Sequence, residues 1–214
     1  MGKISYILII LCAIPSLMMA NTTQTDSLKQ LLCKYKDAEK RCEVYVHLAD
    51  LNVDVFAVAL DYWDKALEEA IECDNVVVIK VALDELVGRL SRIEPKRVEY
   101  YIQLARDVLP ASENKLFVSY LYSQNVLFRT SHEDVETVIE EELARLKAKD
   151  KLTAEEQIEW EFLTAVSMDC ALVEAGGYSM VKDAIPYVER TLSLLSVYPE
   201  EQRCFFEQLC HNKL

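Results

Sequence analysis

Hydrophobic and polar positions repeat along most of the chain with the spacing of α-helices. After residue 20, apolar side chains recur at three- and four-residue intervals, beginning with Leu28, Leu31 and Leu32, which places them on one face of a helix. The run V-V-V-I at residues 76–79 is locally β-like, but its continuation K-V-A-L-D-E-L-V-G-R-L has helical spacing. No segment has the sustained alternation or turn chemistry of a β-hairpin. The pattern therefore predicts an all-α protein.

The predicted helices follow one another with short connections. We expect them at about residues 27–36, 38–51, 55–73, 76–92, 95–109, 112–128, 133–149, 153–174, 178–197 and 199–214. Pro95 lies where a first-turn proline is tolerated. Thr153-Ala-Glu-Glu has the form of a helix-capping box. Gly176 and Gly177 are expected to end the helix before them.

Alternate helices repeat one another at a regular interval. The segments Y-W-D-K-A-L, Y-Y-I-Q-L-A, V-I-E-E-E-L and Y-V-E-R-T-L begin at positions 62, 100, 138 and 187, which are steps of 38, 38 and 49 residues. Helices of a second kind lie between them and carry Y-V-H-L-A-D, V-A-L-D-E-L, Y-L-Y-S-Q-N and F-L-T-A-V-S. Two equal steps and one longer step predict a stack of antiparallel helix pairs with an insertion in the last.

Composition removes several classes of protein from consideration. Only 4 of the 214 residues are glycine, so the usual glycine-rich phosphate loops cannot be assembled. The net charge of −13 should repel nucleic acid and anionic membranes. We therefore expect no nucleic-acid partner, and no membrane insertion apart from the N-terminal segment described next.

The first twenty residues have the pattern of a secretory signal peptide. One early lysine is followed by an apolar run that ends in Met-Met-Ala, and cleavage after Ala20 is the simplest expectation. The alternative is an uncleaved membrane anchor. Cleavage would leave residues 21–214, which we treat as one helical-repeat domain. We expect this domain to be exported to the periplasm.

Export implies an oxidising compartment, where cysteines can form disulfides. Six of the seven cysteines follow residue 20, without the paired C-x-x-C spacing of a zinc site. Cys42 and Cys73 should lie near the same end of an antiparallel helix pair and could form one disulfide. Most of the others are expected to be small buried hydrophobic residues.

One segment resembles a known repeat family. The pattern A59-x-x-x-W63-x-x-A66-L67 is similar to the second helix of a tetratricopeptide repeat, in which small residues admit the neighbouring helix and an aromatic ring fills the gap. The resemblance implies a right-handed α-α superhelix of about four to five antiparallel helix pairs. The expected packing residues are Ala59, Trp63, Ala66, Tyr100, Tyr101 and Tyr187. Later copies depart from the pattern, since Leu104 replaces the alanine of the first copy.

The lead helix T-D-S-L-K-Q-L-L followed by the first repeat also resembles the exported N-terminal repeat region of Bacteroidota tetratricopeptide-containing regulators and histidine kinases. This resemblance implies a non-enzymatic exported module that binds a protein, a peptide or another periplasmic signal as the sensor portion of a regulator. The alternative is a free-standing scaffold or assembly factor of the cell envelope. In tetratricopeptide arrays the first helix of each pair lines the concave groove, and this resemblance makes Asp84, Tyr122 and Asn125 the candidate ligand-binding residues.

The sequence offers little sign of catalysis or of a cofactor. The run His132-Glu133-Asp134 lacks the second histidine of a metalloprotease motif and is expected to cap a helix instead. On one helix Cys204 and Cys210 would point to different faces. We therefore expect no metal and no cofactor. A hydrolase would need a pocket that gathers His132, Cys170 or a pair of carboxylates.

Overall fold

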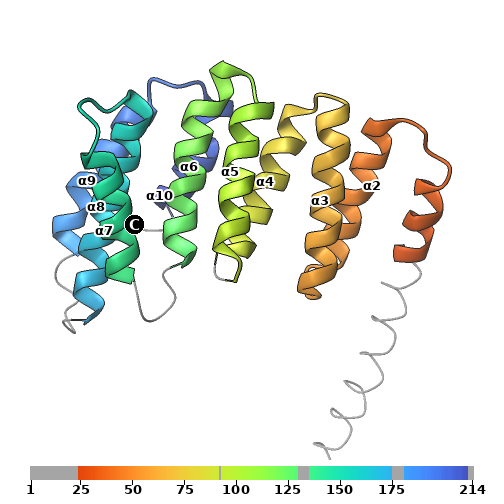
Figure 1. The fold of residues 1–214 in the computed structure, drawn as a ribbon, viewed down its shortest axis with the longest axis horizontal. Helices are drawn as coiled ribbons and strands as arrows, with labels where there is room; N and C mark the ends of the chain where they lie inside the picture. Colours follow the sequence, from red (N-terminus) through yellow and green to blue (C-terminus); the bar gives the residue numbers. More distant parts are fainter. Residues whose placement is uncertain (1–23, 92, 130–134, 175–180, 212–214) are drawn as a thin grey trace, which may run out of the picture. The chain divides into compact units, whose positions relative to one another are not determined.

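The computed structural model describes residues 24–91, 93–129, 135–174 and 181–211, and every regular element in these ranges is a helix (Figure 1). A helix over residues 24–32 comes first. It is followed by α2 (Ala38–Leu51), α3 (Phe56–Glu72), α4 (Val76–Leu90), α5 (Pro95–Val108), α6 (Ala111–Arg129), α7 (Val135–Lys147), α8 (Ala154–Glu174), α9 (Val181–Leu195) and α10 (Glu200–His211). The predicted all-α class is confirmed.

The predicted repeat segments fall on successive helices. The segments that begin at positions 62, 100, 138 and 187 lie on α3, α5, α7 and α9, and those between them lie on α2, α4, α6 and α8. The β-like run at residues 76–79 is the first turn of α4. The predicted signal peptide, the His132 segment and the Gly176–Gly177 pair lie outside the described residues.

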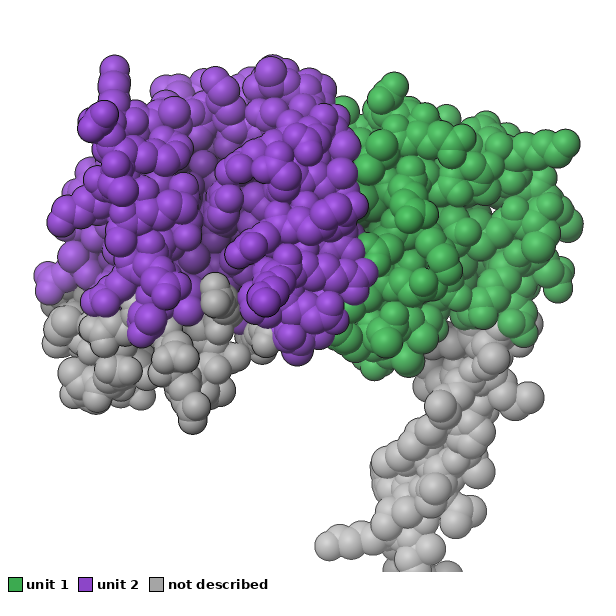
Figure 2. Space-filling model, in the orientation of Figure 1, with its two compact units in different colours: residues 1–82 green, residues 83–214 purple. Residues whose placement is uncertain are grey.

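The chain divides into two compact units, residues 1–82 and 83–214 (Figure 2). In the first unit, α2 and α3 are joined by a short turn and pack against each other. Ala59 and Ala66 are fully buried and Trp63 is 3% exposed. The thiol of Cys42 on α2 lies 3.6 Å from the carbonyl oxygen of Ala66, a close approach that a larger residue at position 66 would obstruct. The alanines thus allow α2 and α3 to pack closely.

Two of the predicted packing residues on α5 differ in position. Tyr101 is 3% exposed and packs inward, whereas Tyr100 is 60% exposed. Consecutive residues of a helix point about 100° apart, so only one of the two rings can face the core. The prediction that Tyr100 packs between helices was therefore wrong. Tyr187 on α9 is half-buried, and the Arg190 guanidinium lies 4.2 Å from the centre of its ring.

The predicted disulfide between Cys42 and Cys73 is not formed in this structure, and both thiols are free. Each sulfur lies near a backbone carbonyl instead, Cys42 near Ala66 at 3.6 Å and Cys73 near Ala70 at 3.7 Å. Burial raises the pKa of the Cys42 thiol to about 11, and the neighbouring Cys73 adds to this effect. The two cysteines therefore lie near each other, as expected, but they are not bonded to each other.

In the second unit, α6 packs against α5, α7, α8 and α10. The last helix, α10, lies beside α6 in Figure 1 and adds two aromatic rings to the core. Phe206 is fully buried, with its ring centre 5.6 Å from that of Phe162 on α8 and 6.0 Å from that of Tyr120 on α6. Phe205 packs edge-on against Phe117 at 5.3 Å. These aromatic contacts tie α10 to α6 and α8.

Among the helices described, none has the length and apolar composition needed to cross a membrane.

Candidate functional site

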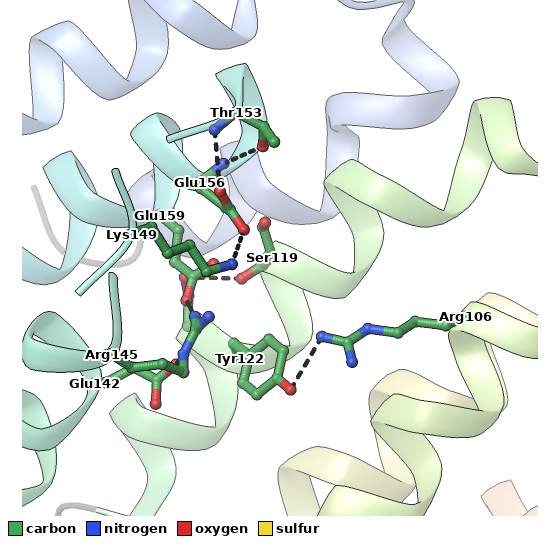
Figure 3. Close-up of polar contacts among 10 residues, drawn as sticks. Arg106, Ser119, Tyr122, Glu142, Arg145, Lys149, Thr153, Glu156 and Glu159 are labelled. Carbon is green, nitrogen blue, oxygen red and sulfur yellow. Dashed lines mark hydrogen bonds and ion pairs between the residues drawn. The ribbon is translucent and has the colours of Figure 1, made fainter. Parts of the chain in front are cut away.

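A cavity of about 300 Å³ lies in the second unit, among α5, α6, α7 and the start of α8. Most of the lining residues are polar or charged, but most of the surface that they expose to the cavity is apolar, with Val118 and the ring of Tyr122 among its members. The lining residues are Arg106, Asn114, Lys115, Val118, Ser119, Tyr122, Arg145, Thr153, Glu155, Glu156 and Glu159. Figure 3 shows the polar contacts among most of them.

Tyr122 is held between two arginines from different helices (Figure 3). The Arg145 guanidinium of α7 lies 4.7 Å from the centre of the ring, and that of Arg106 on α5 lies 5.4 Å from it. Arg106 also donates a hydrogen bond from Nη2 to the Tyr122 hydroxyl, over 3.1 Å. Guanidinium groups near an aromatic face are attracted by its negative charge density. These contacts fix the orientation of the ring at the cavity.

Glu159 is a buried carboxyl at the wall of the cavity and is 1% exposed. Arg145 donates from Nη2 to its Oε1 over 2.5 Å, and the Ser119 hydroxyl is hydrogen-bonded to it as well. Arg145 forms a second ion pair with Glu142, one turn earlier on α7. Burial nevertheless raises the pKa of Glu159 to about 8, because the loss of hydration outweighs the favourable charge of Arg145.

The start of α8 is fixed by the predicted capping box. The Thr153 backbone amide donates to Glu156 Oε2 over 3.0 Å, and the Glu156 amide donates to Thr153 Oγ1 over 3.2 Å. Lys149 forms an ion pair with the same glutamate. Burial alone would raise the pKa of Glu156. The contacts with Lys149 and the Thr153 amide outweigh this effect, so the pKa is lowered. This arrangement positions the first turn of α8, which carries Glu155 and Glu156, two of the three glutamates that line the cavity.

A second polar cluster joins α4 to α6 away from the cavity. The Tyr120 hydroxyl donates to Asp84 Oδ1, and Gln124 donates from Nε2 to the same oxygen over 2.5 Å. Burial raises the pKa of Asp84, and the two hydrogen bonds offset only part of this rise. Burial and the neighbouring carboxylate both raise the pKa of Tyr120. Gln124 also lies against Gly88, since a Cβ at that glycine would be 3.2 Å from the Gln124 nitrogen.

Tyr120→Phe is expected to lower the free energy of unfolding by about 1–2 kcal/mol, because the mutation removes the hydrogen bond that a buried tyrosine donates to the Asp84 carboxylate and leaves the ring contacts in place. Urea unfolding measures the change. Tyr198→Phe is the matched control, because this tyrosine is only half-buried and its hydroxyl bonds Glu155 at 3.1 Å, where water can replace the lost donor. Equal losses in the two variants would show that burial does not strengthen the Asp84 contact.

The three residues predicted to line a groove occupy different places. Tyr122 lies at the cavity, Asp84 belongs to the polar cluster with Tyr120, and Asn125 is absent from the cavity lining. Asn125 Oδ1 is buried without a hydrogen-bond partner. The sequence reasoning missed Arg106, Arg145 and Glu159.

A signal for Glu159 does exist in the sequence. Its neighbours Ile158, Phe162 and Leu163 are fully buried, and their spacing defines the apolar stripe of α8. A glutamate inside this stripe is unusual, because a buried charge needs a partner. The same reading cannot supply the partner, because Arg145 is on the preceding helix.

The residues considered for a metal or a nucleophile are placed only in part. Among the described residues, no group of histidine, cysteine and acidic side chains could hold a metal ion. His132 and the side chain of Cys170 lie outside the described part of the structure. Cys204 is exposed, whereas Cys210 is buried, and burial raises the pKa of the Cys210 thiol to about 12.

The fold and the cavity have to be interpreted from their own geometry. No protein-family model matches the chain, and neither curated proteins nor solved structures gave a match.

Proposed function

We propose that this protein is a non-enzymatic helical-repeat module of the tetratricopeptide kind, and that the cavity in its second unit binds a segment of a peptide or protein. Two observations support the repeat assignment. The predicted repeat segments alternate along α2–α9 in order, and Ala59, Trp63 and Ala66 are buried as the resemblance requires. Repeat proteins of this type present binding surfaces formed by successive helices.

The observation that carries the proposal is the cavity around Tyr122. Its volume of about 300 Å³ is at the lower end of the range for ligand pockets, about 300–1,000 Å³. The polar groups come from several helices, and contacts within the protein already hold Tyr122 and Glu159 in place. A site fixed in advance loses less side-chain freedom on binding. It suits the capture of one or two side chains of an extended peptide.

The raised pKa of Glu159 also has a structural explanation. A carboxyl with a raised pKa at a cavity can mark a general acid. Here, however, Glu159 is 1% exposed and engaged by both Arg145 and Ser119. Through these contacts Glu159 holds the Arg145 guanidinium in position, and Arg145 in turn lies over the ring of Tyr122. We therefore assign Glu159 to positioning rather than to proton transfer.

The proposal keeps the cellular role expected from the sequence. The signal-like first twenty residues support a location outside the cytoplasm, and the resemblance to regulator sensor regions supports peptide binding as the input of a signal. A free-standing envelope scaffold would use the same cavity without a signalling output.

The test is a selection of random displayed peptides on the full chain, followed by affinity measurement with a selected peptide. Tyr122→Ala should weaken binding at least about ten-fold, because aromatic side chains at the centre of an interface contribute a large share of the affinity.

Asn125→Ala is the matched control on the same helix. Asn125 is not part of the cavity lining, and its buried amide oxygen has no partner to lose. The Asn125→Ala variant should bind the selected peptide with the same affinity as the unmodified chain. Equal affinities of all three proteins, or a selection that yields no binding peptide, would refute the proposed function.

A further inference from the structure

Three charged side chains that line the cavity have no ion-pair partner among the described residues. Arg106 donates only to neutral oxygens, the Tyr122 hydroxyl at 3.1 Å and Gln103 Oε1 at 3.3 Å. Lys115, at the start of α6, is exposed. Glu155, in the first turn of α8, accepts a hydrogen bond from the Tyr198 hydroxyl over 3.1 Å. The cavity thus offers two cations and one anion whose charge the protein leaves unneutralised.

The other charges at the cavity are paired within the protein. Arg145 forms ion pairs with Glu142 and Glu159, and Lys149 forms one with Glu156. The contrast matters because a paired charge gives little to a ligand, whereas an unpaired one can form a new ion pair without breaking an old one. The two unpaired cations come from α5 and α6 and the unpaired carboxylate comes from α8, so the opposite charges are contributed by different helices.

We infer that the cavity takes a dipolar ligand, namely a short stretch of peptide that carries one carboxylate and one ammonium group. This inference rests on the proposed function. The carboxylate would bind Arg106 and Lys115, and the ammonium group would bind Glu155. Val118 and the Tyr122 ring, which line the same cavity, would contact the methylene groups between them.

Ligands with charges of one sign are disfavoured by the same side chains. A doubly acidic peptide would meet Glu155 and the net charge of the chain, which is −13. A doubly basic peptide would meet Arg106 and Lys115 at the cavity. Unfavourable pairs of like charge lower the affinity for the wrong partner as effectively as good contacts raise it for the right one. The cavity should therefore select for mixed charge.

The dipolar chemistry has two sources in a peptide. Neighbouring acidic and basic side chains supply it within a chain, and the free ammonium and carboxylate ends supply it in a very short peptide. Four probes separate these sources and the charge types. Three are pentapeptides with blocked ends that carry Lys and Glu, two Glu, or two Lys around a central glycine. The fourth is unblocked triglycine.

Ligand-observed NMR titration of the full chain gives the dissociation constant of each probe. The blocked Lys–Glu peptide should bind at least about five-fold more tightly than both peptides of uniform charge, which is the gain of about one additional ion pair. Triglycine that binds as tightly as the Lys–Glu peptide would assign the site to chain ends, within the same dipolar class. A two-Glu peptide that binds as tightly would overturn the inference.

Charge-neutral variants identify the side chains that are responsible. Glu155→Gln should remove the preference for the Lys–Glu peptide over the two-Glu peptide, whereas Arg106→Gln should weaken both peptides alike by about five-fold. Lys147→Gln and Glu140→Gln are matched controls, because both residues are exposed on α7 and absent from the cavity lining. An unchanged preference in Glu155→Gln would exclude Glu155 as the ammonium-binding group.

Failure of this inference is separable from failure of the proposed function. If selected peptides bind and depend on Tyr122 while the mixed-charge probe shows no advantage, only the dipolar ligand class is rejected. If no selected peptide depends on Tyr122, the binding function itself is rejected.

Discussion

Phe206→Ala is expected to lower the free energy of unfolding by about 3–5 kcal/mol, the usual cost of removing a fully buried phenylalanine ring from a core. The ring is fully buried and contacts both Phe162 and Tyr120. Its loss would open a cavity where α10 meets α6 and α8, which are not free to close it. Urea unfolding followed by circular dichroism measures the effect, and α10 should become sensitive to proteolysis before the rest of the unit.

Two variants serve as controls for this loss. Phe206→Leu keeps most of the apolar volume and should cost less than about 1.5 kcal/mol. Phe205→Ala removes a ring that is only half-buried, so its cost should lie well below that of Phe206→Ala. A loss under about 1 kcal/mol for Phe206→Ala would mean that α10 contributes little to the core of its unit.

Glu159→Gln is expected to change how stability depends on pH. In the folded protein the pKa of Glu159 is raised to about 8 from an ordinary value of 4.5. Between these two values the folded state keeps a proton that the unfolded state has lost, so the contribution of Glu159 to stability falls as the pH rises. Glutamine does not titrate. The stability of the wild-type protein relative to the variant should therefore decline between about pH 4.5 and pH 8.

The size of this decline is on the order of several kcal/mol, at about 1.4 kcal/mol per pKa unit. It is measured as the difference between the unfolding free energies of the two proteins across the pH range, which cancels the titration of all other groups. Below about pH 4.5, the ordinary pKa of a glutamate, Glu159 is protonated in both the folded and the unfolded state. The wild type and the Glu159→Gln variant should therefore have the same pH dependence there.

Glu156→Gln is the matched control one turn earlier on α8, and its effect should have the opposite sign. The pKa of Glu156 is lowered, because its contacts with Lys149 and the Thr153 amide outweigh burial. Its contribution to stability is present at neutral pH and is lost as the pH falls through its folded pKa. Glutamine can still close the capping box. Parallel pH profiles of the Glu159→Gln variant and the wild type would show that Glu159 has an ordinary pKa.

Much of the helical organisation could be predicted from local pattern. The bounds of α2 agree at both ends with the prediction of residues 38–51, and α5 begins at Pro95 as expected. These features depend on neighbours within a few positions, such as the spacing of apolar residues and the place of a proline. Tyr100 shows the limit of this approach, because the repeat alignment marked both tyrosines of α5 and could not determine which one faced the core.

The cavity could be predicted only in part, because its contacts join different helices. Tyr122 was identified through the expected role of its helix, but its partners Arg106 and Arg145 are contributed by α5 and α7. The contact between Asp84 and Tyr120 likewise joins two helices, 36 positions apart in the chain. The repeat alignment pairs Asp84 with Ser123 rather than with Tyr120, so it did not identify this contact.

Helix α6 has a consequence for how the sequence of this protein can change over evolutionary time. One face carries Tyr122 at the cavity, a second carries Gln124 in the cluster with Asp84, and a third carries Phe117 against α10. Among the described side chains of α6 only Ala111, Ser112 and Lys115 are exposed, whereas α7 has more exposed positions, such as Glu140 and Lys147. Substitutions should therefore accumulate more slowly in α6 than in α7 among proteins descended from the same ancestor.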